Sequence, residues 1–323
     1  MAQLTSIELC AGAGGQALGL ETAGFSHEVL VENDKWAQKT LLLNRPEWKV
    51  LDGPEADLTK FDPTPYKGVD LVAGGVPCPP FSKAGKQLGA KDERDLFPDA
   101  LRVIREVRPK AVLLENVRGF LDAVFRDYRN DLKSQLKKLG YPLVEWHLYN
   151  ASDFGVSQLR PRVVIVAMRD EYAPNFEWPS GGNIHPPTVG ELLYEMMSEN
   201  GWKGAKKWRD RANEIAPTLV GGSKKHGGPD LGPTRSKRAW EALGVNGKTI
   251  ADEAPDKDFV GMPRLTVQMA ARIQGFPADW IFAGKKTNAY RQVGNAFPPP
   301  VAKAIGQSVM AAILQTKTIY AVA

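Results

Sequence analysis

Short runs of apolar and β-branched residues alternate with longer segments of helical periodicity along the first half of the chain. Strands buried on both faces of a parallel sheet are indicated by the runs SIELCA, HEVLVEN, VDLVAGG, KAVLLEN and RVVIVAM. Amphipathic helices are predicted for GQALGLETAG, KWAQKTLLLN, FPDALRVIREV and FRDYRNDLKSQLKKLG. Strands and helices that alternate at this spacing predict a doubly wound α/β domain.

The pattern changes near Pro179. Residues 179–262 are rich in Gly, Pro and charge and have poor periodicity, so we expect a second, smaller and irregular region there. Beyond it, KTNAYRQVGNAFPPP predicts a polar loop, and VAKAIGQSVMAAILQ predicts a final apolar helix. No apolar run approaches the ~18 residues of a membrane span, and we expect no contact with a membrane.

The positive charge is concentrated in one part of the chain. The 323 residues carry a net charge of +5. Residues 203–238 contain ten Lys or Arg and three acids, which gives a local charge of +7 and leaves −2 for the rest. Either a solvated loop region or a polyanion-binding face explains this concentration.

The cysteine and histidine content and the N-terminus bear on the compartment. Two cysteines cannot form a disulfide framework, and four histidines in dissimilar contexts predict no metal site. The start, MAQLTSIELCAGAGG, has no basic region followed by an apolar core, so we expect no signal peptide. A reducing cytoplasm fits these features best.

The N-terminal segment IELCAGAGGQALGLETAGF predicts a strand, a glycine-rich turn and a helix. Gly12, Gly14 and Gly15 allow the backbone to turn tightly and to approach a ligand, and the helix N-terminus offers free N–H groups. Glu32 follows 20 residues after Gly12, where an acid can accept hydrogen bonds from both ribose hydroxyls. We therefore expect an adenosine cofactor, although an NAD fingerprint also fits. Asp57 either accepts from the adenine amino group or is a plain loop acid.

Cys78 lies between Pro77 and Pro79, directly after the predicted strand VDLVAGG. The two prolines stiffen the backbone, which suits a thiol held in a fixed place. The alternative is a buried cysteine that acts as a small hydrophobic residue.

Gln158, Arg160 and Arg162 alternate along a segment that Pro161 keeps extended. A period of two places all three on one face. Two neighbouring guanidiniums repel unless an anion lies between them, so an anionic partner is expected. A salt-bridged pair at the surface is the alternative.

The motifs VPCPPFS, LLENVRGF and QLRPR occur in this order after AGAGG and before RIQGFP and YRQVGNA. In order and spacing they resemble the C5-cytosine-specific DNA methyltransferases, which use S-adenosylmethionine and belong to bacterial restriction-modification systems. The resemblance covers nearly all of the chain outside 179–262. It implies a Rossmann-like, mostly parallel sheet in a catalytic and cofactor-binding domain (1–178, completed by 286–323). Residues 179–285 would form the target-recognition domain and hinge.

The resemblance also implies roles for the catalytic residues. Cys78 matches the nucleophile that adds to C6 of cytosine, and Glu115 matches the acid that acts near N3. Both follow strands of a parallel sheet, whose carboxyl ends converge on one crevice. Arg162 is expected to support Glu115, and Arg160 is expected near cytosine O2 and the thiol. Asn116 either positions the loop or is a plain turn residue.

The family pattern implies two further sets of residues. Cofactor contacts are expected from Cys10, Ala11, Gly12, Gly14, Gly15, Glu32, Asn33, Asp57, Leu58, Pro77, Leu96, Asn295 and Ala296. DNA contacts are expected from Ser82, Gln87, Thr218 and Leu219. The basic segment 203–238 adds Lys224, Lys225, Arg235 and Arg238 as expected DNA contacts. Cys10 stands where the family often has an aromatic residue, and we expect it to pack rather than react. Residues 82–95 are expected to close as a lid over a flipped cytosine.

One departure from the family and three alternatives remain. Gln268-Met269 stands where the family usually has Arg-Glu, which puts a local salt bridge in doubt. The alternatives are a tRNA cytosine methyltransferase of the same fold, an NAD-dependent oxidoreductase, and a DNA-binding protein without catalysis. We expect a monomer that acts on double-stranded DNA in a bacterial or phage-host cytoplasm.

Overall fold

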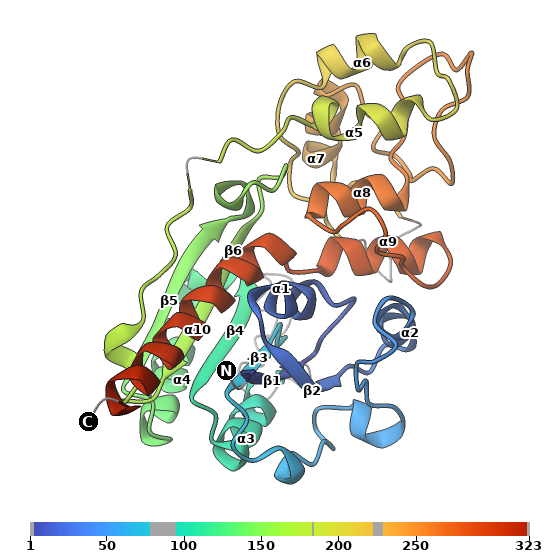
Figure 1. The fold of residues 1–323 in the computed structure, drawn as a ribbon. Coiled ribbons are helices and arrows are strands. Elements are labelled where there is room, and N and C mark those ends of the chain that lie inside the picture. The colour runs from blue at the N-terminus through green and yellow to red at the C-terminus, as the bar shows by residue number, and fades with distance from the viewer. Residues whose placement is uncertain (1–2, 78–94, 183, 222–228, 322–323) are drawn as a thin grey trace.

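A six-stranded sheet forms the centre of the computed structural model, which describes residues 3–77, 95–182, 184–221 and 229–321 (Figure 1). The strand order is β2-β1-β3-β4-β6-β5. The strands are β1 (Thr5–Leu9), β2 (Ser26–Val31), β3 (Leu71–Gly74), β4 (Ala111–Val117), β5 (Leu143–Asn150) and β6 (Pro161–Met168). Only β6 runs antiparallel to its neighbours, β4 and β5. The predicted, mostly parallel α/β sheet is confirmed.

Helices cover both faces of this sheet. They are α1 (Gly15–Ala23), α2 (Lys35–Asn44), α3 (Phe97–Val107), α4 (Arg126–Lys138) and α10 (Pro299–Ala321). The buried side chains of α3 and α4 share one apolar core with the sheet. Leu20 of α1 and the buried side chains of α10 belong to a second core on the other face. Ala17 and Leu18 of α1 belong to a third core, which extends to the residues after the sheet. The sheet and these five helices are called the sheet lobe below.

Short 3-10 helices occur in the loops of the sheet lobe. They are η1 (Gly53–Ala56), η2 (Thr64–Tyr66), η4 (Arg118–Leu121), η5 (Ala123–Phe125), η6 (Ala151–Phe154) and η7 (Ala173–Asn175). The strand β5 was not among those predicted from sequence. Only scattered positions of LVEWHLYN are buried, so the strand lacks the continuous apolar run that marks the other five.

A second, smaller lobe lies beyond the sheet and is built from helices (Figure 1). Its helices are α5 (Val189–Ser198), α6 (Ala205–Arg211), α7 (Thr234–Ala242), α8 (Val267–Gln274) and α9 (Lys286–Asn295). We call residues 189–295 the helical lobe. The expectation of an irregular region is corrected in part, because four of these helices lie within 179–285. With seven to ten residues each, they are too short for a clear helical period.

The prediction of a polar loop for KTNAYRQVGNAFPPP is wrong, because most of this segment forms α9. Ala289, Tyr290 and Val293 form the buried side of this helix. They belong to an apolar core that also contains Leu41 of α2 and Trp280 of the helical lobe. The core is therefore continuous between the lobes, and the division at 178/179 and 285/286 stays a prediction.

The glycine-rich turn after β1 contacts the helical lobe directly. The Trp280 indole N–H donates to the Ala13 carbonyl at 3.2 Å. A Cβ on Gly14, whose φ is 86°, would lie 2.8 Å from the Leu41 side chain and 3.0 Å from Trp280. The carboxyl ends of the parallel strands thus face the helical lobe. Among the described helices, none is long and apolar enough to cross a membrane.

Candidate active site

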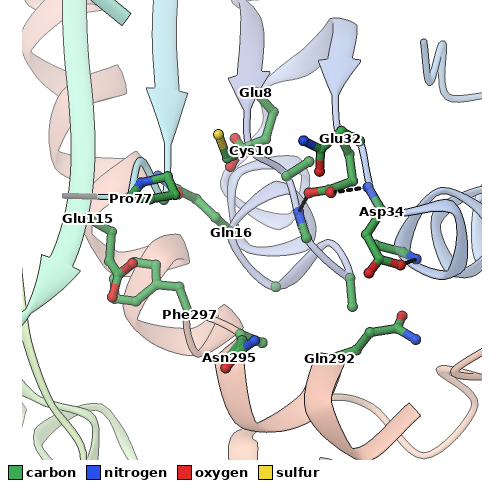
Figure 2. A pocket seen from close by; sticks show the side chains of 18 of the residues that line it. Glu8, Cys10, Gln16, Glu32, Asp34, Pro77, Glu115, Gln292, Asn295 and Phe297 are labelled. Carbon is green, nitrogen blue, oxygen red and sulfur yellow. Dashed lines mark hydrogen bonds between the residues drawn. The ribbon is translucent and has the colours of Figure 1, made fainter. Parts of the chain in front are cut away.

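A cavity of about 460 Å³ opens where the parallel strands end and the helical lobe begins. Figure 2 shows Glu32 and Asp34 on one side of it and Glu115 on the other. Most of the residues predicted to bind a cofactor line its wall: Cys10, Ala11, Gly12, Gly15, Glu32, Asn33, Leu58, Pro77, Leu96, Asn295 and Ala296. One cavity therefore gathers segments that are separated by up to almost 300 residues.

Glu32 lies at the end of β2 and ties the glycine-rich turn to the start of α2. Its two carboxylate oxygens accept from Gly12 N–H and Asp34 N–H, both at 2.7 Å. Burial raises the pKa of Glu32, and these backbone N–H groups oppose the rise. Each carboxylate oxygen has a second lone pair, so Glu32 can still accept from a ligand hydroxyl.

Two predicted cofactor residues do not line the cavity. Gly14 caps α1 and is packed against Leu41 and Trp280. Asp57 lies between two lining residues, but its Oδ1 accepts from the backbone and the hydroxyl of Thr59, which lowers its pKa. The structure therefore favours the interpretation of Asp57 as a loop acid.

Cys10 lies on the cavity wall with a positive φ of 52°. Burial raises the pKa of its thiol well above the ordinary value, and the nearby Glu32 and Glu8 carboxylates raise it further. A neutral buried thiol is a poor nucleophile. This environment agrees with a packing role.

Glu115 and Arg162 form a largely buried ion pair on the opposite wall. They lie on the neighbouring strands β4 and β6, and Arg162 Nε is 2.7 Å from Glu115 Oε1. Burial raises the pKa of Glu115, while the guanidiniums of Arg162 and Arg160 lower it, and the net shift is upward. The Glu115 carboxyl group therefore stays protonated to a higher pH than the carboxyl group of an exposed glutamate, which suits proton transfer.

The family model described as C-5 cytosine-specific DNA methylase matches residues 4–311. The chain belongs to this family. Close relatives of the methylase are the type II methyltransferases M.NgoMIV of Neisseria gonorrhoeae and M.NaeI of Lentzea aerocolonigenes. M.NgoMIV is 55% identical over 318 residues, which cover 96% of this chain and 98% of the relative. M.NaeI is 55% identical over 317 residues, which cover 97% of this chain and 76% of the relative.

Solved structures show the same fold at low identity. A prophage-encoded candidate DNA modification methyltransferase of E. coli has a TM-score of 0.66 and 21% identity, with 96% of the methylase and 99% of that chain covered. Spodoptera frugiperda DNMT2 has a TM-score of 0.65 and 18% identity, with 95% and 99% covered. The predictions of the family, of the fold and of a DNA cytosine-5 methyltransferase are confirmed.

Arg160 is expected near cytosine O2 and the Cys78 thiol, and this placement stays a prediction because Cys78 lies outside the described residues. Arg160 does not line the cavity. Its guanidinium donates to the carbonyls of Leu219, Gly294 and Ala296 at 2.7, 2.7 and 3.0 Å. Arg160 is completely buried and precedes β6, so it reaches into the contact between the lobes. Among the described residues, Arg162 near the start of β6 is the one that forms an ion pair with Glu115.

Asn116 holds the segment that leads to the predicted nucleophile. Its side-chain amide donates to the Val76 carbonyl at 3.1 Å, two residues before Cys78. This hydrogen bond supports the interpretation of Asn116 as a residue that positions the loop. Outside the described residues lie Cys78, Ser82, Gln87, Lys224, Lys225 and nearly all of the expected lid, 82–95.

The remaining DNA-binding candidates have different environments. Arg235 and Arg238 are exposed, one turn apart on α7, and neither has an ion pair among the residues that the structure describes. Thr218 donates through its hydroxyl to the Leu159 carbonyl. Leu219 is completely buried, so its side chain is not available to DNA. Its predicted DNA contact is corrected accordingly.

Sequence reasoning missed several residues of the cavity, notably Glu8 and Gln16. Glu8 is completely buried, and within the described structure neither of its carboxylate oxygens has a hydrogen-bond partner. Burial raises its pKa well above the ordinary value. A signal was present, because an acid interrupts the otherwise apolar strand SIELCA. The other missed lining residues include Asp34, Arg291, Gln292 and Phe297.

At Gln268-Met269, where the sequence departs from the family, hydrogen bonds hold the segment in place of a salt bridge. Gln268 donates through its amide to the carbonyls of Ala278 and Trp280 at 2.7 and 3.1 Å. Met269 is buried, and its backbone N–H donates to the Thr266 hydroxyl, which caps α8. Hydrogen bonds therefore hold this segment of the methylase.

Proposed function

We propose that the methylase is a type II modification enzyme that methylates C5 of cytosine at a specific short sequence in double-stranded DNA, with S-adenosylmethionine as methyl donor. The observation that carries the proposal is the single cavity that joins Glu32, suited to a ribose, to the largely buried Glu115–Arg162 pair. The proposed cofactor site and the acid proposed to act at cytosine N3 would thus lie on facing walls.

The residues present fit S-adenosylmethionine. Glu8 supplies a buried carboxyl group without a partner in the described structure, which matches a ligand with an ammonium group and a sulfonium. Gly12 has no atom within 4 Å of the position of a Cβ, so its backbone is accessible to a ligand. Glu32 would hold the ribose. S-adenosylmethionine, when bound, supplies the methyl group that is transferred.

The chemistry on the base falls to three side chains. The Cys78 thiolate would add to C6 of cytosine, which makes C5 nucleophilic. Electron density then moves toward N3, where Glu115 would donate a proton as the negative charge develops. Arg162 would hold the Glu115 carboxyl in place through the 2.7 Å contact. The contact of Asn116 with Val76 would fix the backbone ahead of Cys78.

The target cytosine must leave the DNA stack before this chemistry can begin. A C5 atom in duplex DNA is stacked, and flipping the nucleotide out costs a few kcal/mol. Arg235 and Arg238 on α7 are exposed and have no ion pair among the described residues, which favours the polyanion-binding explanation of the basic segment. Both side chains would contact phosphates or guanine edges. We propose that the enzyme acts as a monomer in the cytoplasm.

Bisulfite sequencing of DNA from a host that expresses the chain tests this function. We expect 5-methylcytosine at one short sequence, and loss of the signal with Cys78→Ser. Purified protein incubated with labelled S-adenosylmethionine and either duplex DNA or tRNA should label the DNA. Labelling of tRNA alone would instead support the tRNA methyltransferase.

A further inference from the structure

Two buried side chains of the sheet lobe hold a single peptide unit of the helical lobe. Gln158 Oε1 accepts from Leu219 N–H at 2.8 Å, and Arg160 Nη1 donates to the Leu219 carbonyl at 2.7 Å. Both side chains are completely buried. Leu219 is thereby fixed through both of its backbone polar groups.

The other side of the same guanidinium reaches the cavity wall. Arg160 Nη2 donates to the Gly294 carbonyl at 2.7 Å and to the Ala296 carbonyl at 3.0 Å. Gly294 and Ala296 line the cavity, as does Asn295 between them. One side chain thus joins Leu219 to the wall that faces the proposed cofactor.

A direct backbone contact reinforces this connection. A Cβ on Gly294 would lie 2.5 Å from the Cα and N of Gly221. A Cβ on Gly221 would lie 2.1 Å from Asn295 Oδ1. Residues 219–221, called the junction segment here, are therefore packed directly against this wall.

Simple packing does not account for an arginine at this position. Burial lowers the pKa of Arg160, and among the described residues no carboxylate lies within ion-pair distance of its guanidinium. A buried charge is costly, and an apolar side chain would fill the space at lower cost. What arginine adds is a planar fork of donors that bonds to three carbonyls of two separate chain segments at once.

We propose that Arg160 is a positioning residue that couples the binding of DNA by the helical lobe to the binding of S-adenosylmethionine in the cavity. The inference rests on the proposed function. Duplex DNA bound by the helical lobe would restrain the junction segment further, and through Arg160 it would restrain the Gly294–Ala296 wall. The second ligand then meets a wall that is already arranged, so each ligand raises the affinity of the other by the same factor.

The test measures the affinity for S-adenosylhomocysteine by calorimetry, once without DNA and once with a saturating DNA duplex. The duplex contains the target sequence that bisulfite sequencing identifies. The coupling factor is the ratio of the two dissociation constants. We expect the parent to show a factor of about 10, within the usual range for coupled sites. Arg160→Lys keeps the charge but not the fork, and we expect its factor to fall to within twofold of one.

Gly221→Ala is a second variant, and it removes no buried polar group. Its Cβ displaces Asn295 and the junction segment, and we expect the coupling factor to fall at least threefold. This variant decides the question if Arg160→Lys does not fold. Arg129→Lys is the matched control, because Arg129 also bonds to two carbonyls, Phe120 and Asp122, but only within the sheet lobe. Its coupling factor should equal that of the parent.

Three results would overturn the inference. They are a parental factor within twofold of one, an unchanged factor in the folded Arg160 and Gly221 variants, and an equal loss in Arg129→Lys. Binding of S-adenosylhomocysteine without binding of any duplex would overturn the proposed function, and this inference with it. A purely structural role would weaken both measured affinities together and leave their ratio intact.

Discussion

The two lobes of the methylase position their functional groups in different ways. In the sheet lobe, Glu32 and Glu115 lie at strand ends, so the regular hydrogen-bonding pattern of the sheet sets where they point. In the helical lobe, the junction segment is held by side chains that come from the other lobe. The comparison shows that the sheet lobe positions Glu32 and Glu115 through its own secondary structure, whereas the junction segment of the helical lobe depends on contacts between lobes.

Replacing Cys78 with serine should distinguish the functions of the two lobes most clearly, because it should abolish methyl transfer but not DNA binding. A hydroxyl is a much weaker nucleophile than a thiolate at neutral pH, so we expect methyl transfer to fall to background. Duplex affinity, which depends on the helical lobe, should change less than threefold. Methyl transfer within tenfold of the parent would contradict the covalent mechanism.

Glu115→Gln should lower the rate of methyl transfer by about 10²- to 10⁴-fold, the usual contribution of a general acid. The effect belongs to the sheet lobe alone, so the affinities for duplex and for S-adenosylhomocysteine should stay near those of the parent. Because the protonated form of Glu115 is required and its pKa is raised, the parental rate should fall as the pH rises through that pKa. Single-turnover rates between pH 5 and 9 measure both effects.

Arg235→Ala with Arg238→Ala tests the helical lobe. If the two side chains bind phosphates, the slope of log affinity against log salt should become shallower by about 0.9 for each contact. If they read guanine edges, each should cost roughly 1–3 kcal/mol at the cognate sequence. Lys137→Ala with Lys138→Ala on α4 removes the same charge from the sheet lobe and is the control. An equal loss in both pairs would show a nonspecific effect of net charge.

Glu8→Gln tests whether the cavity of the sheet lobe is built for a cationic ligand. Loss of a charge-assisted contact should weaken S-adenosylhomocysteine binding by about 1.5–3 kcal/mol. The raised pKa of Glu8 has a second consequence for the free protein. Stability from this group is fully present below its unfolded pKa and is lost as the pH rises through its folded pKa.

The glutamine variant cannot ionise and should escape this loss. Without ligand, its free energy of unfolding should exceed that of the parent at pH 8, and the difference should shrink at pH 4–5. Urea denaturation at the two pH values measures it. Equal pH dependence in both proteins would show that Glu8 is ionised in the free enzyme.

The smallest effect concerns the short helices of the helical lobe. Thr188 caps α5 by accepting from Glu191 N–H, whereas α1 and α3 of the sheet lobe begin without a side-chain cap. Thr188→Ala should lower the free energy of unfolding by about 1 kcal/mol. Thr188→Ser retains the hydroxyl and should restore most of the stability in the same denaturation experiment.

What the sequence could predict follows the same division. Five strands, the flanking helices and the residues at the strand ends were predicted, because continuous apolar runs and the convergence of strand ends are local signals. The sequence could not show that Arg160 and Arg162 diverge, because that depends on where β6 begins and on carbonyls more than 50 residues away. The helices α5–α7 were missed because each is short and stabilised by tertiary packing.

The close contact of Gly221 with Gly294 and Asn295 bears on how such enzymes could be recombined. An exchange of recognition regions between relatives would place foreign backbone against this wall. Any residue larger than glycine at position 221 would push Asn295 out of place. A functional chimera therefore has to keep the parental junction segment, or import it together with its matching wall.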